Sequence, residues 1–198
     1  MSQPRAVIQA ESNPRSLANP ALAFVRDYWH AKRGSRQMPA RSDIRPADLK
    51  KYLDSIVMID VLGGGDFRYR LVGTTITRYF LTDPTGMHVA EAWAPVGENA
   101  VKRIVGNLSA VVAGRVPVRL WGQVDWIGTG EDFDALYLPF SDDGEHVTMI
   151  LNLFTFDRQR ILMERQIAIE AGRTSLVEPA EPPQPPQPHR KSTRPKKA

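Results

Sequence analysis

Residues 19–53 read NPALAFVRDYWHAKRGSRQMPARSDIRPADLKKYL, and the fold can be worked out from this stretch. Asn19 is a favourable helix N-cap, and Pro20 suits the first helical position because no backbone N–H is needed there. The apolar side chains that follow recur at helical spacing, at Leu22, Val25 and Trp29. The pattern predicts a helix over 20–33 whose apolar stripe must be buried against segments that come later in the chain.

Composition limits the classes of protein that this chain can represent. The chain has 198 residues, of which 42% are hydrophobic, so it has room for one domain of about 150 residues plus tails. It has no cysteine, which excludes disulfides, thiolate metal sites, a catalytic thiol and thiol-attached cofactors. The first residues lack the apolar run of a secretory signal, and no run approaches a membrane span. We therefore expect a cytoplasmic location.

The net charge of +4 is concentrated at the C-terminal end. Residues 178–198 contain five basic and two acidic residues, a net charge of +3, and the remainder carries only +1. A nearly neutral body gives no sign of a nucleic-acid surface, so nucleic acid is an unlikely partner for the folded part. The same end is rich in proline, which favours an extended polyproline form.

Five segments have the pattern of strands: 56–62, 67–72, 116–127, 135–140 and 147–156. The first and the last are apolar on both faces, whereas the second and third alternate between apolar and polar residues. Because an antiparallel sheet places fully apolar strands at its centre, we predict an α+β fold with strand order 2-1-5-4-3. A long amphipathic helix around 101–112 and smaller helices would cover one face, and the N-terminal helix would cover the other.

This layout divides the chain into four parts. We expect a flexible N-terminus over 1–18 and a folded domain over 19–157. A C-terminal helix over 158–174 and a disordered, proline-rich basic tail over 175–198 would follow. The Gly63–Gly65 run joins two strands, so it reads as a hairpin turn and not as a phosphate-binding loop.

The sequence resembles the PAS sensory domain family, and most closely a branch of short, stand-alone bacterial PAS proteins. The residues that carry the resemblance are Tyr28-Trp29, Arg33-Gly34, the Pro39–Asp43 segment, the Phe67–Thr74 strand and the Thr85-Gly86 turn. The resemblance covers roughly 20–157. It implies a PAS-like five-stranded antiparallel sheet and a sensory or regulatory role through a small ligand or a protein partner in signal transduction. It implies no catalytic residue and no particular cofactor.

A ligand pocket is one hypothesis for the helical face of the sheet. Its candidate lining residues are Tyr69, Tyr79, Phe80, Leu120 and Trp126. Aromatic side chains with polar tips suit a small apolar or aromatic ligand. The alternative is that these side chains simply fill the core, which any domain of this size requires.

Four other residues are candidates for an interaction or dimer face: Trp29, Trp121, Arg68 and Arg70. Trp121 shares a strand face with Arg119 and would pack under Trp29 or form part of a dimer contact. Arg68 and Arg70 share a strand face that could hold an anion, although a solvated face is the simpler reading. A homodimer is compatible with this set.

Two alternative functions from other classes remain open. A small cone-shaped α+β enzyme, of isomerase or dehydratase type, would need a buried acid or base, and Asp60 in the first strand is the one residue from which it could start. Enzyme signature motifs are absent, so we expect no enzyme. The basic tail could instead bind nucleic acid or an anionic surface. The four histidines have no metal-ligand spacing, and haem ligation by His88 is not favoured, so we expect no metal or cofactor.

Overall fold

A computed structural model describes residues 7–80, 83–124 and 131–156 of the chain. Its strands are β1 Val7–Ser12, β2 Ile56–Gly63, β3 Asp66–Val72, β4 Val118–Val124, β5 Glu131–Phe140 and β6 Met149–Phe156. Its helices are α1 Pro20–Arg33, α2 Thr74–Phe80, α3 Val89–Trp93 and α4 Glu98–Gly114, with 3-10 turns η1 Arg41–Asp43, η2 Pro46–Ser55 and η3 Ala94–Val96. The helix expected over 158–174 and the tail over 175–198 lie outside the described residues.

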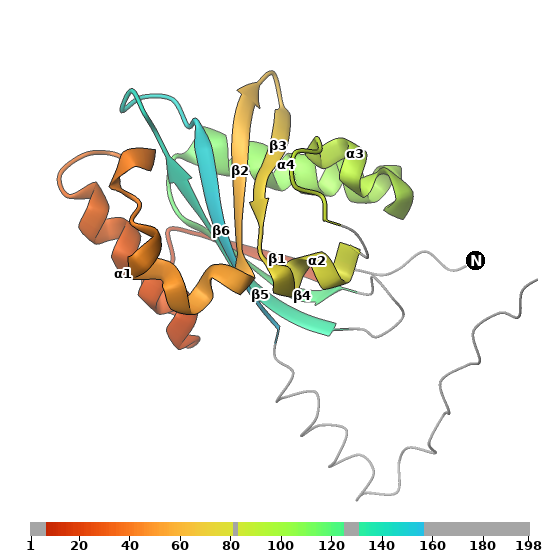
Figure 1. Cartoon of the computed structure of the whole chain (residues 1–198), viewed down its shortest axis with the longest axis horizontal. Helices are drawn as coiled ribbons and strands as arrows, with labels where there is room; N and C mark the ends of the chain where they lie inside the picture. The colour runs from red at the N-terminus through yellow and green to blue at the C-terminus, as the bar shows by residue number, and fades with distance from the viewer. Residues whose placement is uncertain (1–6, 81–82, 125–130, 157–198) are drawn as a thin grey trace, which may run out of the picture. The chain divides into compact units, whose positions relative to one another are not determined.

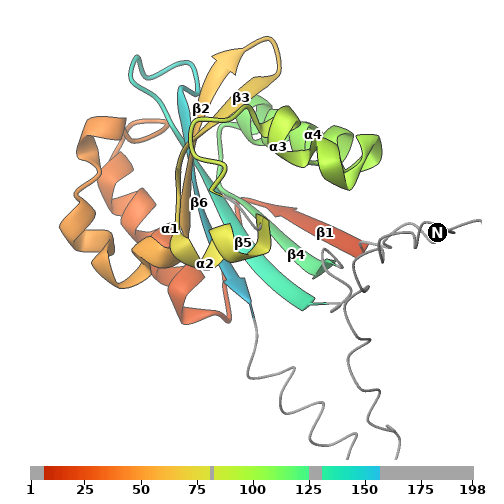
Figure 2. The same ribbon diagram turned by 45° about the vertical axis from the view of Figure 1, so that its right-hand side comes forward.

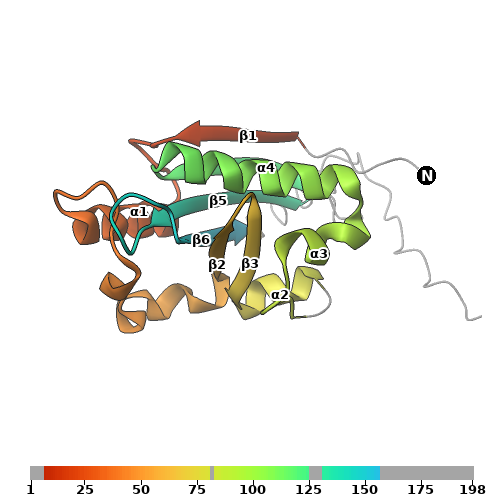
Figure 3. The same cartoon turned by 90° about the horizontal axis from the view of Figure 1, so that it is seen from above.

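The strands form one antiparallel sheet in the order β1-β4-β5-β6-β2-β3. Five of these strands are the ones expected from the sequence, and they have the predicted order, with the first (β2) beside the last (β6). Helices cover both faces of the sheet at these two central strands. This burial on both faces accounts for the nearly continuous apolar sequence of each strand. The sheet has one more strand than expected, and Figure 2 shows this strand, β1, at the edge beyond β4, while Figure 3 shows it from above.

Strand β1 corrects the prediction that residues 1–18 are a flexible terminus. Residues Val7–Ser12 pair with β4 from Ser12 opposite Val118 to Val7 opposite Gln123. The Asn13 amide then donates a 2.6 Å hydrogen bond to the Pro117 carbonyl and extends the ladder. The segment VIQAES is too short and too mixed to give a clear strand pattern, so its strand conformation depends on pairing with β4, a contact between residues more than 100 positions apart.

Helix α1 begins as the sequence predicts. The Asn19 side-chain oxygen accepts hydrogen bonds from the Ala21 and Leu22 amides at 2.9 and 3.4 Å, which satisfies two donors that the first turn leaves free. The predicted apolar stripe is fully buried, at Leu22, Val25 and Trp29. Helix α1 packs on β5 and β6, and Figures 1 and 2 show α1 and η2 on one side of the sheet with α3 and α4 on the other.

The two faces of the sheet can be read from the strand register. Pairs such as Tyr137 with Asn152 and Ile59 with Tyr69 place these side chains on the face that α3 and α4 cover, here called the inner face. Asp60, paired with Arg68 one step along, therefore points to the opposite or outer face. Helix α1 and η2 lie on that outer side.

Strand β5 differs from its prediction in length and position. It begins at Glu131, four residues before the predicted start at 135, and it is an inner strand although it contains Pro139, a residue type usually confined to edge strands and bulges. A proline is tolerated there because β4 begins at Val118, opposite Tyr137, so no β4 residue lies beside Pro139 to accept an N–H.

Candidate functional site

A cluster of polar side chains lies buried on the inner face of the sheet. Tyr69 comes from β3, Tyr137 from β5 and Asn152 from the centre of β6, and Trp93 reaches them from the end of α3. All four are buried, and the Trp93 indole nitrogen donates a 2.8 Å hydrogen bond to the Tyr69 hydroxyl. We call these four residues the inner polar cluster. It brings hydrogen-bonding atoms together in an otherwise apolar core.

Asn152 is the unusual member of the inner polar cluster. Its side chain has no exposed surface, and neither its amide nitrogen nor its oxygen has a hydrogen-bond partner in the structure. The Asn152 amide lies near the Tyr137 hydroxyl and lowers its pKa against the larger effect of burial, but the two groups are not in hydrogen-bonding geometry. A buried amide without partners costs about 1–3 kcal/mol, so its presence calls for a compensating interaction.

Burial also keeps the two tyrosines in their neutral form. It raises the pKa of Tyr69 to about 12, although the hydrogen bond from Trp93 opposes the rise. Burial raises the pKa of Tyr137 as well, and the neighbouring Tyr69 adds to that effect. Both hydroxyls therefore remain protonated at neutral pH, and each can donate as well as accept a hydrogen bond.

Charged side chains lie on the other face. Asp60 is buried, and its two carboxylate oxygens pair with Arg68 at 3.3 Å and Arg70 at 2.5 Å. Because Asp60 points away from Tyr69 and is held by two arginines, the enzyme alternative loses the residue from which it started. Arg68 and Arg70 are partly exposed, as a solvated strand face predicts, but each is committed to Asp60.

The predicted pocket residues are only partly brought together. Tyr69 and Leu120 are both buried on the inner face, as expected. Tyr79 and Phe80 lie in α2, but their side chains are outside the described part of the structure, and so is the whole of Trp126. These three assignments stay predictions, and so does the choice between a ligand pocket and a filled core.

The predicted interaction face is wrong for Trp29. The side chain is 1% exposed, and its indole nitrogen donates a 2.7 Å hydrogen bond to the Pro139 carbonyl. Nor does Trp29 pair with Trp121, which instead stacks under the Arg119 guanidinium, 4.6 Å from the ring centroid. A residue on the apolar stripe of a covering helix is needed in the core, so Trp29 is not available to a partner.

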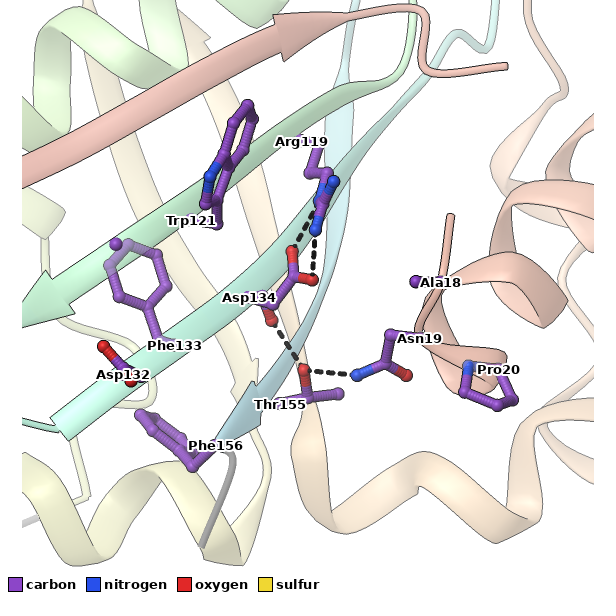
Figure 4. A pocket seen from close by; sticks show the side chains of 11 residues that line it. Ala18, Asn19, Pro20, Arg119, Trp121, Asp132, Phe133, Asp134, Thr155 and Phe156 are labelled. Carbon is purple, nitrogen blue, oxygen red and sulfur yellow. Dashed lines mark hydrogen bonds and ion pairs between the residues drawn. The ribbon is translucent and has the colours of Figure 1, made fainter. Parts of the chain in front are cut away.

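Trp121 and Arg119 form part of a groove on the outer face, with a volume of about 550 Å³ (Figure 4). The groove lies between the start of α1 and strands β4, β5 and β6. Arg119 donates from Nε and Nη2 to the two carboxylate oxygens of Asp134, at 2.8 and 2.7 Å. These hydrogen bonds raise the pKa of Arg119 despite partial burial.

The other polar groups drawn in the groove are also paired. Asn19 donates a 2.9 Å hydrogen bond to the Thr155 hydroxyl, which donates in turn to the Asp134 carbonyl at 2.9 Å. The network ties the first turn of α1 to β6 and β5. Since these groups satisfy one another, the groove presents less unmet hydrogen-bonding capacity than the inner polar cluster, which is therefore the stronger candidate site.

Sequence reasoning missed three of the four cluster residues: Trp93, Tyr137 and Asn152. Asn152 had a signal, because it is the one amide in the apolar run VTMILNLFTF. A lone amide at a position predicted to be buried on both faces needs a partner and could have been identified on that ground. Trp93 and Tyr137 had no such signal, since only the fold places them near Asn152.

We looked for metal-ligand clusters and for membrane-spanning helices among the described residues. Within 7–80, 83–124 and 131–156, no three histidine, aspartate or glutamate side chains gather as metal ligands. His88 pairs with Asp66 at 2.8 Å near the β2–β3 turn. No helix among those residues has the length and apolar character needed to cross a membrane.

The fold and the cluster together define a class of protein: an antiparallel sheet with helices on both faces and a small polar cluster beneath the helices of the inner face. A family model described as "PAS domain" matches residues 17–155, and the chain belongs to this family. No curated protein matches the chain. A solved structure of an RNA-binding Light-Oxygen-Voltage receptor is similar, with 13% sequence identity and a TM-score of 0.48. That similarity covers 85% of this chain and 44% of the receptor chain, so the chain spans less than half of that protein.

Proposed function

We propose that this chain is a PAS-type sensory or regulatory protein that binds an uncharged small molecule at the inner polar cluster. The observation that supports this proposal is the fully buried Asn152 amide, whose donor and acceptor are both without a partner. A ligand with an adjacent donor and acceptor, such as an amide or lactam edge, would satisfy both groups at once. The binding free energy would come from the new hydrogen bonds, and also from removing the penalty of a buried amide that has no partner.

The lack of charge around the cluster supports a neutral ligand. The inner-face side chains of β2, β3 and β6, and those of β5 from Phe133 onward, are uncharged, whereas Asp60, Arg68, Arg119 and Asp134 all lie on the outer face. A carboxylate or phosphate buried there would have no cation to compensate its lost hydration. The flat side chains of Trp93, Tyr69 and Tyr137 suit a flat ligand.

Regulation would follow from the position of Trp93. This residue joins α3 to the sheet through the Tyr69 hydroxyl, so a ligand at the cluster competes with or reinforces that hydrogen bond. A ligand that favours one position of α3 shifts the population of helix arrangements and alters the surface presented to a partner. The membership in a branch of short bacterial PAS proteins, a cytoplasmic location and a homodimer remain part of this proposal.

The test compares the protein as purified, the protein after denaturation and refolding away from small molecules, and the variant Asn152→Leu. We expect native mass spectrometry to show a bound species of a few hundred daltons in the first sample only. Refolding should lower the unfolding temperature of the natural protein, because the ligand stabilises the folded state by mass action.

Asn152→Leu separates a ligand site from a structural amide. If the amide is unpaired without ligand, replacing it by an apolar side chain of similar volume stabilises the refolded protein by about 1–3 kcal/mol and abolishes binding. A large loss of stability in refolded Asn152→Leu would show that Asn152 is bonded within the protein, and the proposal would be wrong.

A further inference from the structure

The outer helical layer exposes apolar side chains that the fold does not need. Phe24 on α1 is 42% exposed and Leu53 on η2 is 37% exposed, two of the few large hydrophobic residues of the described chain that face solvent. Phe24 lies off the buried stripe of α1, and its ring meets that of Tyr52 at a centroid distance of 5.4 Å. Leu53 directly follows Tyr52 in η2, and we call Phe24, Tyr52 and Leu53 the apolar centre, which includes residues of α1 and η2.

Basic side chains surround this apolar centre. Lys51 lies over the Tyr52 ring at 5.5 Å, and Lys50 shares a side of η2 with Leu53 because residues three apart align in a 3-10 helix. Arg45 adjoins them, since its amide donates a 3.0 Å hydrogen bond to the hydroxyl of Tyr28, one turn along α1 from Phe24. We call Phe24, Tyr52, Leu53, Arg45, Lys50 and Lys51 the outer patch (the α1–η2 layer in Figure 1).

The three cations of the outer patch have no carboxylate partner within the described chain. The ion pairs of this layer involve other residues: Arg26 with Asp27, Lys32 with Asp48 and Arg36 with Asp43. The outer patch therefore combines exposed apolar area with uncompensated positive charge.

Charge is also separated along the chain. Residues 20–55 contain eight basic and four acidic residues, a net charge of +4. Residues 56–156 contain seven basic and twelve acidic residues, a net charge of −5. The near-neutral total thus conceals a positive outer layer attached to a negative sheet and inner layer, which would orient an acidic partner toward the outer patch.

We infer that the outer patch is a docking surface for an acidic segment of a partner protein, one that presents apolar side chains between carboxylates. An aromatic and aliphatic centre within a charged rim is the composition of a protein–protein contact. Nucleic acid fits less well, because three cations around an apolar centre neutralise few phosphates. The patch lies on the opposite side of the sheet from Asn152, so the inference does not depend on the ligand proposed above.

The test uses a defined probe with the full-length chain. The probe is a fluorescent 16-residue peptide with leucines at positions i, i+3, i+4 and i+7 and glutamates between them, and binding is measured by fluorescence polarisation. One control peptide replaces every glutamate by glutamine, and another replaces every leucine by serine. We expect the acidic apolar peptide to bind at least tenfold more tightly than either control, and to lose affinity as salt rises from 50 to 300 mM.

Matched variants locate the binding on the protein. Leu53→Ser and Lys51→Gln should each lower the affinity for the probe peptide at least fivefold. Val96→Ser removes an apolar side chain of similar exposure, 44%, from η3 beside α4, and Lys102→Gln removes one charge from α4; both should bind as the natural protein does. Lys51→Gln changes only a surface charge, so it still decides the question if Leu53→Ser fails to fold.

Three results would overturn the inference. The first is that the acidic apolar peptide does not bind the natural protein, or that it binds Leu53→Ser and Lys51→Gln as tightly as it binds the natural protein. The second is displacement of the bound probe by a single-stranded dT20 oligonucleotide at equal concentration, which would assign the patch to nucleic acid. The third is a dimer, seen by light scattering, that Lys51→Gln dissociates, which would assign the patch to a second copy of this chain.

Discussion

The Trp29 indole donates a 2.7 Å hydrogen bond to the Pro139 carbonyl and so joins α1 to β5 at the point where β5 has no β4 neighbour. Pro139 has no N–H, and its carbonyl would otherwise be left without a partner under a helix. The Trp29 side chain is therefore both a member of the buried stripe of α1 and the hydrogen-bond donor to a β5 carbonyl that no strand pairs.

We expect Trp29→Ala to destabilise the protein by about 3–5 kcal/mol, because it removes a large buried side chain and leaves a cavity. Trp29→Phe keeps much of the volume but leaves the Pro139 carbonyl unpaired, so its cost should be about 1–3 kcal/mol. Urea unfolding measures both. Phe24→Ala, on the exposed side of the same helix, is the control and should cost only about 1 kcal/mol, through the loss of the contact with Tyr52. A Trp29→Phe protein as stable as the natural one would contradict a role for the hydrogen bond.

Gly73 occupies a position where no side chain fits. A Cβ atom there would lie 2.3 Å from the Asp54 carbonyl oxygen and 2.7 Å from that of Leu53, and both are backbone atoms that cannot move aside. Gly73 also donates to the Ile56 carbonyl at 2.8 Å and accepts from the Ile76 amide at 2.9 Å, which fixes the path from β3 into α2. We expect Gly73→Ala to destabilise by more than about 3 kcal/mol.

Gly106 provides the matched control for Gly73. It lies within α4, and a Cβ atom there would meet nothing within 4 Å. Gly106→Ala should therefore stabilise the protein by about 0.5–1 kcal/mol through helix propensity. Equal effects of the two substitutions in thermal unfolding would show that close backbone approach does not constrain Gly73.

Removing the Asp60 carboxylate should be costly although the residue has no catalytic task. Asp60→Asn leaves Arg68 and Arg70 side by side without a counter-charge, and we expect a loss of about 1–3 kcal/mol since both arginines are partly exposed. Combining Asp60→Asn with Arg70→Met should recover part of the loss, and a double-mutant cycle by urea unfolding measures the coupling. Strictly additive effects would mean that the pair does not contribute to stability.

Alkaline pH should weaken the fold through the buried tyrosines. A tyrosine whose folded-state pKa is raised keeps its full contribution below the unfolded pKa of about 10, and that contribution is lost as pH rises toward the folded value. For Tyr69 the loss falls between about pH 10 and about 12, because the unfolded chain releases its proton first. Tyr137 adds to it in the same direction.

The measurement is unfolding free energy between pH 9 and 11, with tyrosinate absorbance followed in parallel. Tyr69→Phe should reduce the decline above pH 10 by up to about 1.4 kcal/mol per pH unit, while it also removes the hydroxyl to which the Trp93 indole donates. Tyr52→Phe, on the outer layer, should leave the slope unchanged. The buried role of Tyr69 would be refuted by a slope that is the same in Tyr69→Phe and in the natural protein.

Much of the architecture was predictable because its signals are local. The cap at Asn19, the stripe Leu22–Trp29 and the two strands apolar on both faces lead to the helix, the sheet order and the PAS-like layers without any long-range information. Strand β1 was not predictable in this way, because VIQAES has no strong pattern and gains its structure from β4.

Apolar periodicity at α1 and in the central strands was sufficient to place the layers. An apolar helix stripe or strand face is visible in the local sequence, and it must be buried wherever it occurs. Which polar groups meet was a different matter. Asn152 faces Tyr137 because β5 and β6 pair in one register, Asp134 meets Arg119 across β4 and β5, and Lys51 lies over the Tyr52 ring and not beside a described carboxylate. Hydrogen bonds and ion pairs require contact within a few ångströms, and residues distant in sequence reach that separation only through the assembled sheet.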